Sequence, residues 1–404
     1  MKDEYGQLIS SLAQVNDKKI VMLVLDGLGD IDNKGKGTAL QMARTPNMDK
    51  LAQKAALGLA HPVFPGISPG SGPGHLGLFG YDPVIYQIGR GVLSALGLEF
   101  KLLKGDVAAR LNFCTLDKEG KVEDRRAGRI SSEKNKELIE KIKKNLQTDD
   151  DVEVFFETES EHRALMVLRG EDLDDKVGDT DPQQTGKKPL DPTNPPYDDS
   201  KTAKIARDIF EQVREILKDE SPANMILSRG FAQLPDWPPF HERYRLNPVA
   251  VAGYPMYRGI ARLLGMEVFS EPKTPKDIIS ETVSAMKKHD FVFTHFKDPD
   301  KTGENGDIQE KIKALEAMDE ALPELIGNEP DVLIITGDHS TPAPLSAHSW
   351  HPVPVLLKAP GLRGPFLKSF DEITALKGEL GTISSKEIIT LAMAHAGKLA
   401  KFGA

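Results

Sequence analysis

Three hydrophobic segments that lie far apart in the chain each lead into an acid or a histidine, and this pattern constrains the fold most. The segments are IVMLVL before Asp26, FVF before Thr294-His295, and VLII before Thr336-Gly337-Asp338-His339. Continuous β-branched and aliphatic runs are typical of strands buried on both faces of a parallel sheet. Ligands of open α/β sheets bind outside the carboxyl ends of the strands, so the three ends predict one shared site.

Helical patterns lie between these segments, as an α/β fold requires. Thr45-Pro46 with Asp49 in the first turn predicts a helix start, with threonine as the N-cap and proline at the first helical position. Apolar residues at helical spacing predict further helices at 254–265 and 385–397. We therefore expect an α/β core with a mostly parallel sheet flanked by helices.

The middle of the chain has a different composition. It is rich in charge and combines an amphipathic helical stretch, alternating strand-like pieces and a proline-rich loop at 181–196. This composition and this mixture of predicted elements indicate a separate, smaller α+β domain inserted into the core. The expected organisation is a discontinuous core, residues 1–97 and 235–404, with an inserted domain at 98–234.

Composition excludes several classes of partner. The chain has 404 residues and a formal net charge of -9, which argues against nucleic acid because a polyanion needs an excess of Lys and Arg. No apolar run approaches the roughly 20 residues that cross a bilayer. The single cysteine, Cys114, lies in the apolar run LNFCTL and is expected to be a buried hydrophobe in a cytoplasmic protein.

Acids and histidines follow the predicted strands in a number that suggests metal binding. They are Asp26, Asp300, Asp338, His339 and His348. Carboxylates combined with imidazoles suit Zn or Mn, and two ions would be needed to use all five side chains. For any one acid alone, capping a helix or a turn is an equally good interpretation.

A loop rich in glycine and proline offers a hydroxyl group. Residues 65–75 (PGISPGSGPGH) lead into LGLF, which predicts a tight turn with a serine at a helix N-terminus, where amide dipoles favour an anion. A divalent cation can lower the pKa of such a serine and make it a nucleophile. Read alone, the loop is equally compatible with a purely structural turn.

The motifs of this chain resemble those of a known family. The segments VLDGLGD, TPNMDKLA, GISPGSGPGHLGLFGYDP, DVAARLNF, HRALMVLRG, GDTDP and TGDHSTPAPLSAHSWHPVPVL look like successive motifs of archaeal-type cofactor-independent phosphoglycerate mutases, in the alkaline phosphatase superfamily. The resemblance implies an enzyme of glycolysis and gluconeogenesis that interconverts 3-phosphoglycerate and 2-phosphoglycerate. It also implies a two-metal core, a phosphoserine intermediate, and an inserted domain that closes over the small phosphorylated substrate.

The resemblance also implies roles for individual residues. Ser71 in PGSGPGH matches the phosphorylated nucleophile, and Asp26, Asp338 and His339 match the ligands of the metal that activates it. Asp300 and His348 match ligands of a second metal. Mn or Zn are the expected ions, with Mg or Co as alternatives.

Two positions depart from the family pattern. The family commonly has histidine four residues after the aspartate that Asp300 matches, whereas this chain has Glu304. Glutamate can still bind Mn or Zn through oxygen, although a harder, more negative site changes the metal preference. Gly72-Pro73 also replaces the acid and aliphatic residue that often follow the serine.

Candidate substrate contacts come from the charges that phosphoglycerate carries. Arginine pairs with phosphate and carboxylate through its planar fork. The candidates in the insert are Arg110, Arg126, Arg129, His162, Arg163, Asp179, Asp181 and Arg229, and those elsewhere are His75 and Lys297. For any single arginine, a solvated surface position is the more common role.

Other functions stay compatible with the sequence. One is a metal-dependent phosphatase, or a mutase acting on another phosphorylated metabolite. Another is a catalytically silent relative that only binds phosphorylated ligands, which Glu304 and the altered serine loop motivate. The sequence leaves open whether the chain forms homo-oligomers.

Overall fold

The computed structural model describes residues 3–148 and 151–403 and divides the chain into two compact units. The first comprises the residues up to Gln87 and from Trp237 onward, and the second is Ile88–Asp236. The second unit thus begins ten residues before the predicted insert, 98–234. The reason is that helix α5 (Arg90–Gly97) packs within it, with Gly91 so close to the Ala108 carbonyl that no side chain would fit.

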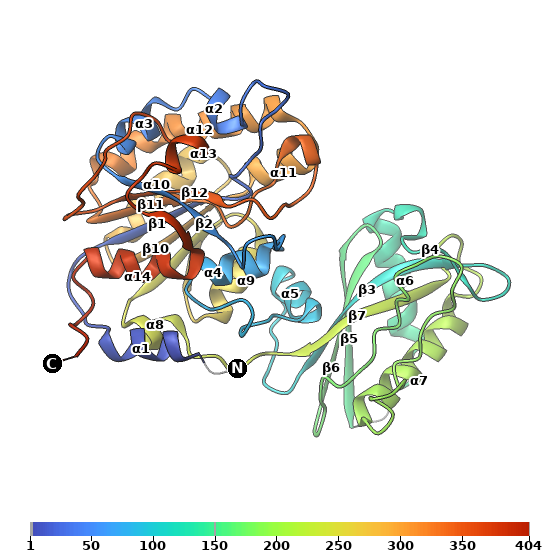
Figure 1. Cartoon of the computed structure of the whole chain (residues 1–404). Coiled ribbons are helices and arrows are strands. Elements are labelled where there is room, and N and C mark those ends of the chain that lie inside the picture. Colours follow the sequence, from blue (N-terminus) through green and yellow to red (C-terminus); the bar gives the residue numbers. More distant parts are fainter. Residues whose placement is uncertain (1–2, 149–150, 404) are drawn as a thin grey trace. The chain divides into compact units, whose positions relative to one another are not determined.

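The first unit is built on an eight-stranded sheet with the order β13-β2-β12-β11-β1-β10-β8-β9 (Figure 1). Its strands are β1 (Ile20–Leu25), β2 (Ala56–His61), β8 (Pro248–Ala252), β9 (Glu267–Ser270), β10 (Phe291–Phe296), β11 (Val332–Thr336), β12 (Val353–Lys358) and β13 (Gly381–Ser384). Only β12 runs antiparallel to its neighbours. The prediction of an α/β fold with a mostly parallel sheet is therefore confirmed.

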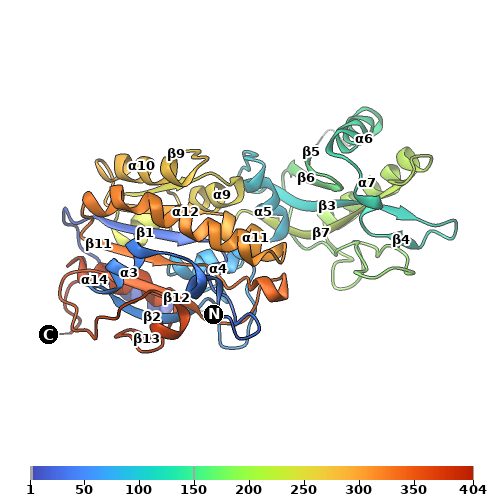
Figure 2. The same ribbon diagram turned by 90° about the horizontal axis from the view of Figure 1, so that it is seen from above.

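Helices cover both faces of this sheet (Figures 1 and 2). One face carries α2 (Ala39–Met42), α3 (Pro46–Ala52), α10 (Pro275–Met286), α12 (Ile308–Gly327) and α13 (Glu372–Ala375), which share an apolar core with alternate residues of β1. The other face carries α1 (Glu4–Leu12), α4 (Ser71–Leu78), α8 (Phe240–Tyr244), α9 (Pro255–Leu263) and α14 (Ser385–His395). Among the described residues, no helix combines the length and apolarity needed to cross a membrane.

Three neighbouring parallel strands bring the predicted ligands to one edge. In the register, Val24 of β1 pairs with Thr336 of β11 on one side and with His295 of β10 on the other. Asp26 follows β1, the segment containing Asp300 follows β10 as α11 (Asp298–Glu304), and Asp338 follows β11. The predicted convergence of these strand ends is present in the structure.

The second unit is an antiparallel sheet with helices on both faces. Its elements, besides α5, are β3 (Val107–Leu116), β4 (Val122–Asp124), a 3-10 turn (Ala127–Arg129), α6 (Ser132–Asn145), β5 (Val152–Ser160), β6 (Arg163–Gly170), α7 (Lys201–Leu217) and β7 (Met225–Gln233). β3 is central and pairs with β4, β6 and β7. The main core lies between this sheet and α6 and α7, and it includes the buried Cys114.

The predicted helix start at Thr45 is right in position and wrong in mechanism. Thr45 is the N-cap residue of α3, but its side chain accepts no capping hydrogen bond. The carboxylate of Asp319, on α12, accepts instead from the backbone N–H groups of Asn47 at 3.1 Å and Met48 at 2.8 Å. A distant acid therefore satisfies the free amides that a local threonine was expected to cap.

Candidate metal centre and anion-binding pocket

Ser71 lies beside a buried cluster of acids and a histidine in the first unit. Its Oγ is 3.4 Å from His339 Nε2, and this nitrogen lies 3.4 Å from Asp26 Oδ1 and 3.1 Å from Asp338 Oδ2. Asp26, Asp338 and His339 have no exposed surface. The four predicted residues therefore surround a single point, although they come from three separate segments of the chain.

Helix α4 and the loop before it place the Ser71 hydroxyl. Ser71 is the first residue of α4, and the N-cap residue Gly70 makes no side-chain capping bond. The helix packs tightly against the loop after β11. A Cβ on Gly74 would lie only 2.5 Å from the Asp338 carbonyl oxygen, so only glycine fits there. Ser71 thus sits at a helix N-terminus, where free amides and the helix dipole favour an anion.

Thr341 fixes the proton on the His339 ring. Its Oγ1 donates to Asp300 Oδ1 at 2.5 Å and also lies 3.0 Å from His339 Nδ1. A hydroxyl that already donates its hydrogen can only accept from the imidazole, so Nδ1 carries the proton. His339 Nε2 is left with its lone pair facing Asp26, Asp338 and Ser71, which is the form that binds a metal.

A second group of possible ligands lies next to the first. His348 Nε2 is 3.3 Å from Asp300 Oδ1 and 3.5 Å from Glu304 Oε1. The opposite nitrogen, Nδ1, donates to the Pro69 carbonyl at 3.0 Å, so Nε2 is the nitrogen available to a cation. The imidazole rings of His339 and His348 stack with centroids 3.7 Å apart.

Lys297 lies between the two acidic groups. Its Nζ is 3.1 Å from Asp26 Oδ2, 2.5 Å from Asp300 Oδ2 and 3.1 Å from the Tyr257 hydroxyl. Burial would raise the pKa of Asp26, but the hydrogen bond from His295 and the positive charge of Lys297 hold it well below its usual value. Asp26 is therefore anionic at neutral pH, as a metal ligand must be.

Two buried carboxylate oxygens of this cluster have no hydrogen-bond partner, which is the environment that a bound cation would complete. They are Asp26 Oδ1 and Asp338 Oδ2. An unpartnered buried carboxylate oxygen is costly unless an ion completes its environment. Two sets of side chains have ligand atoms within 4.8 Å of one another: Asp26, Asp338 and His339, and Asp300, His339 and His348. Mixed oxygen and nitrogen ligands of this kind fit divalent Mn or Zn.

Several residues behind the ligands were not predicted as site residues. His295 Nε2 lies 3.0 Å from Asp26 Oδ2, and its ring packs on Tyr257 with centroids 3.8 Å apart. His75, which was predicted as a substrate contact, is fully buried, with Nδ1 3.2 Å from Asp338 Oδ2 and 2.9 Å from the Ser71 carbonyl. His295 was a usable signal because it follows the predicted strand FVF, although in the structure it lies inside β10, which runs to Phe296. Tyr257 carries no such signal.

The second unit contains a pocket lined mainly by arginines. It has a volume of about 340 Å³ and is lined by Arg90, Arg110, Asn112, Arg125, Arg126, Arg129, Glu161, His162, Arg163 and Arg229. The Nε atoms of Arg110, Arg163 and Arg229 and Nδ1 of His162 are buried without a hydrogen-bond partner. Carboxylate oxygens of Glu159, Glu161 and Asp181 lie 3.8 to 3.9 Å from these atoms, beyond hydrogen-bond distance. A cavity with this excess of arginine suits a phosphate or a carboxylate.

A strained turn at one side of this pocket is held by an acid. Ala127, Gly128 and Arg129 all have positive φ, a conformation that costs free energy in non-glycine residues. Asp124 holds the turn by accepting from the Gly128 N–H and from the Arg126 N–H at 2.8 Å.

Asp179 and Asp181 support the pocket without lining it. Asp179 accepts from the Gly230 N–H at 2.7 Å, next to the predicted substrate contact Arg229. Asp181 accepts from Arg125 at 3.0 and 2.6 Å and lies 3.8 Å from Arg229. Of the predicted substrate residues in the insert, two acids, Asp179 and Asp181, lie outside the wall of this cavity, and six residues line it: Arg110, Arg126, Arg129, His162, Arg163 and Arg229.

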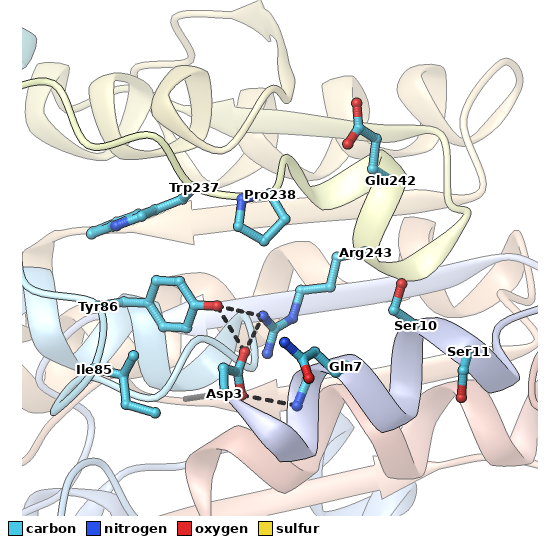
Figure 3. A pocket seen from close by; sticks show the side chains of 11 residues that line it. Asp3, Gln7, Ser10, Ser11, Ile85, Tyr86, Trp237, Pro238, Glu242 and Arg243 are labelled. Carbon is cyan, nitrogen blue, oxygen red and sulfur yellow. Dashed lines mark hydrogen bonds and ion pairs between the residues drawn. The ribbon is translucent and has the colours of Figure 1, made fainter. Parts of the chain in front are cut away.

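In another cavity of the first unit, of about 690 Å³, the charged groups of Asp3 and Arg243 are already paired with each other and with Tyr86 (Figure 3). Arg243 donates to Asp3, to the Tyr86 hydroxyl at 3.2 Å and to the Gly80 carbonyl at 2.6 Å. The Tyr86 hydroxyl also donates to Asp3 at 2.8 Å. These contacts anchor the N-terminal helix α1 and do not add to the metal centre.

Known proteins resemble this chain over almost its whole length. A family model described as 2,3-bisphosphoglycerate-independent phosphoglycerate mutase matches residues 52–224. A Thermus thermophilus protein named "Probable 2,3-bisphosphoglycerate-independent phosphoglycerate mutase" is 50% identical over 402 residues, covering 98% of this chain and 99% of the relative. A Thermotoga maritima protein of the same name is 46% identical over 399 residues, with equal coverage.

Solved structures resemble it as well. The cofactor-independent phosphoglycerate mutase of Thermoplasma acidophilum is 34% identical, with a TM-score of 0.73 over 94% of this chain and 100% of that one. A Pyrococcus horikoshii protein is 31% identical, with a TM-score of 0.80 over 96% of this chain and 100% of that one. The likeness thus includes both units.

Proposed function

This chain belongs to the 2,3-bisphosphoglycerate-independent phosphoglycerate mutases, as its motifs predicted, and on that premise we propose how its residues interconvert 3-phosphoglycerate and 2-phosphoglycerate. The phosphoryl group passes through Ser71 at a site for two divalent cations. The single observation that carries this proposal is the contact of 3.4 Å between Ser71 Oγ and His339 Nε2, inside a buried group of carboxylates.

The ligands divide into two sets. His339 presents one free lone pair, so it would serve the cation that Asp26 and Asp338 would also hold, next to Ser71. Asp300 and His348 would hold the other cation, and Glu304, 3.5 Å from His348 Nε2, would supply a third ligand to it. The cations, Mn or Zn, would polarise the phosphoryl oxygens and lower the pKa of the serine hydroxyl.

The residues of the chain carry the group in two steps. Ser71 Oγ forms a bond to phosphorus, the bond between phosphorus and the 3-oxygen of the substrate breaks, and the proton of Ser71 ends on the 3-oxygen, which becomes a hydroxyl. The 2-hydroxyl oxygen of the same glycerate then attacks the phosphorus, the bond to Ser71 Oγ breaks, and the proton of the 2-hydroxyl returns to Oγ. Lys297, beside both acidic groups, stabilises negative charge on the phosphoryl oxygens.

We assign substrate binding to the second unit. The arginine pocket combines positive charge with unpartnered donors, which supports recognition of the anionic groups of the glycerate. Arg163 and Arg229 contribute buried Nε atoms and are the strongest candidates. The lid role that the family resemblance implies for the insert stays a prediction.

We also place the enzyme in the cytoplasm. A mutase of phosphoglycerate works where glycolytic intermediates are found. The lone cysteine, Cys114, is buried among apolar residues and fits a reducing compartment.

The Ser71→Ala variant tests the proposal. The protein is stripped of metal, reloaded with Mn, Zn, Co or Mg, and assayed for conversion of 3- to 2-phosphoglycerate and for release of inorganic phosphate. We expect mutase activity with little phosphate release from the wild type, and loss of both in the variant. Activity that survives the substitution contradicts the covalent route, and phosphate release without conversion identifies a phosphatase.

A further inference from the structure

Lys311, on helix α12, is completely buried, which is rare for a lysine. Its Nζ donates to three backbone carbonyls, those of Thr341 at 2.8 Å, Gly27 at 2.9 Å and Gly29 at 3.2 Å. An ammonium group has three hydrogens, so these three acceptors match its full capacity. The side chain thus joins the loop after β1 to the loop after β11.

A buried carboxylate balances the charge of Lys311. Asp30 Oδ2 lies 3.3 Å from Nζ, and both groups have fully buried side chains. Glu372, on α13, accepts from the Asp30 N–H at 3.0 Å and from the Thr38 hydroxyl at 2.6 Å. Burial lowers the pKa of Lys311, whereas the negative charge of Asp30 opposes that effect. Only the protonated amine can donate to all three carbonyls, so the contacts require the charged form.

The two loops that Lys311 joins carry the proposed metal ligands. Gly27 directly follows Asp26, and Thr341 lies two residues after His339. The Thr341 hydroxyl in turn contacts Asp300 and His339. Positive φ at Gly27, together with an Asp300 Cα only 2.8 Å from a Cβ built there, leaves the loop no room for a side chain.

We propose that Lys311 is a positioning residue that holds the ligand-bearing loops at the spacing the cations require. The proposal rests on the two-metal site of the proposed function. Lys311 contacts no ligand side chain, so it acts through the backbone of the two loops. Without its donors, the Thr341 carbonyl would lose this partner, and the Gly27 and Gly29 carbonyls would keep only the Thr341 N–H, at 3.3 and 3.1 Å. The link between the two loops would therefore weaken.

Lys311→Met tests the proposal, because methionine matches the apolar part of the lysine side chain and removes the donors and the charge. The matched control is Lys398→Met. Lys398 is equally buried and donates to the Asn16 carbonyl at 2.7 Å and to Asp290 at 3.0 Å, remote in sequence from the ligand loops. Mn²⁺ is titrated into metal-free protein, and the unbound ion is followed by its EPR signal. Urea unfolding of each variant is measured in parallel.

Substitution of a residue that supports a metal ligand typically weakens metal affinity about 10- to 100-fold, and we expect Lys311→Met to weaken Mn²⁺ binding by that factor. Lys398→Met should lose comparable stability and keep the wild-type affinity. Equal Mn²⁺ affinity in Lys311→Met and wild type would overturn the proposal, as would an equal loss in both variants. If Lys311→Met does not fold, Asp30→Asn replaces it, with a weaker loss of affinity expected and an unchanged affinity counting against the proposal. A wild type that binds neither Mn²⁺ nor Zn²⁺ would instead overturn the proposed function itself.

Discussion

Glu372 makes the stability of the first unit depend on pH. Its carboxyl group is buried beside Asp30, and burial raises its pKa from 4.5 to about 7, with the positive charge of Lys311 opposing the shift. Below pH 4.5 Glu372 is protonated in both the folded and the unfolded chain, so its contribution to the stability of the folded state is fully present. Between pH 4.5 and about 7 Glu372 ionises in the unfolded chain but stays protonated in the folded one, so the folded state loses stability as the pH rises.

The size of the effect follows from the shift. One pKa unit corresponds to about 1.4 kcal/mol, so a rise from 4.5 to about 7 amounts to about 3 kcal/mol of unfolding free energy. In Glu372→Gln the side chain is neutral at every pH and can still accept from the Asp30 N–H. The unfolding free energy of the variant should therefore rise relative to the wild type by about 3 kcal/mol between pH 4.5 and pH 7.5.

Tryptophan fluorescence reports this unfolding selectively. The chain has two tryptophans, Trp237 and Trp350, and both belong to the first unit. Urea titrations of wild type and Glu372→Gln at several pH values between 4.5 and 7.5 yield the difference in unfolding free energy. A difference that stays constant across this range would refute the reasoning, because it would mean that Glu372 titrates alike in both states.

Three further predictions concern other parts of the chain. Glu304→Ala should reduce bound Mn²⁺ from two ions to one per chain at moderate concentrations, whereas Glu304→His should keep both; two tightly held ions in the alanine variant would contradict the ligand role. Asp3→Asn leaves the buried Arg243 without its carboxylate and should cost about 1 to 3 kcal/mol at pH 7. Burial would raise the pKa of Asp3, but the Gly6 N–H, the Tyr86 hydroxyl and Arg243 lower it. The difference in unfolding free energy between wild type and Asp3→Asn should therefore shrink as the pH falls below 3.8. A difference independent of pH argues against the pairing of Asp3 with Arg243. Burial raises the pKa of the Cys114 thiol, so a thiol reagent at pH 8 should label it only when denaturant opens the second unit, and rapid labelling of the native protein would disagree with its burial.

The sheet and its functional edge could be predicted because their signals are local. Six consecutive aliphatic residues before Asp26 indicate a buried strand without knowledge of its neighbours, and β1 has the predicted bounds, Ile20–Leu25. The runs before His295 and Asp338 likewise became β10 and β11. Since parallel strands end at one edge, their terminal residues could be assigned to one region before any coordinates were known.

Residues whose role depends on long-range packing could not be predicted. Lys311 lies in a helix with many charges, where lysine is normally exposed, and its carbonyl partners are about 30 or more than 280 residues away in the sequence. Thr341 shares its motif with two predicted ligands, but its bridge from Asp300 to His339 requires a fold that brings α11 beside the loop after β11. The Asp319 cap of α3 was missed for the same reason.

The arginine pocket could be predicted only in part. Arg129, Arg163 and Arg229 were named from their charge and motifs, while Arg90 and Arg125 were not. Arginine side chains are usually solvated, and nothing local distinguishes a pocket residue from a surface one. Antiparallel pairing of β3 with β6 on one side and β7 on the other places Arg163 and Arg229 on the two strands that flank β3, and the sequence does not reveal that pairing.

Trapping of the phosphorylated enzyme tests the central claim most directly. Protein loaded with Mn²⁺ is mixed with 3-phosphoglycerate carrying a radioactive phosphoryl group, quenched in acid within milliseconds, digested and mapped by mass spectrometry. We expect the label on the peptide that contains Ser71, and none in Ser71→Ala. Conversion to 2-phosphoglycerate without label on the protein, or with label on another residue, would contradict a phosphoserine at this position.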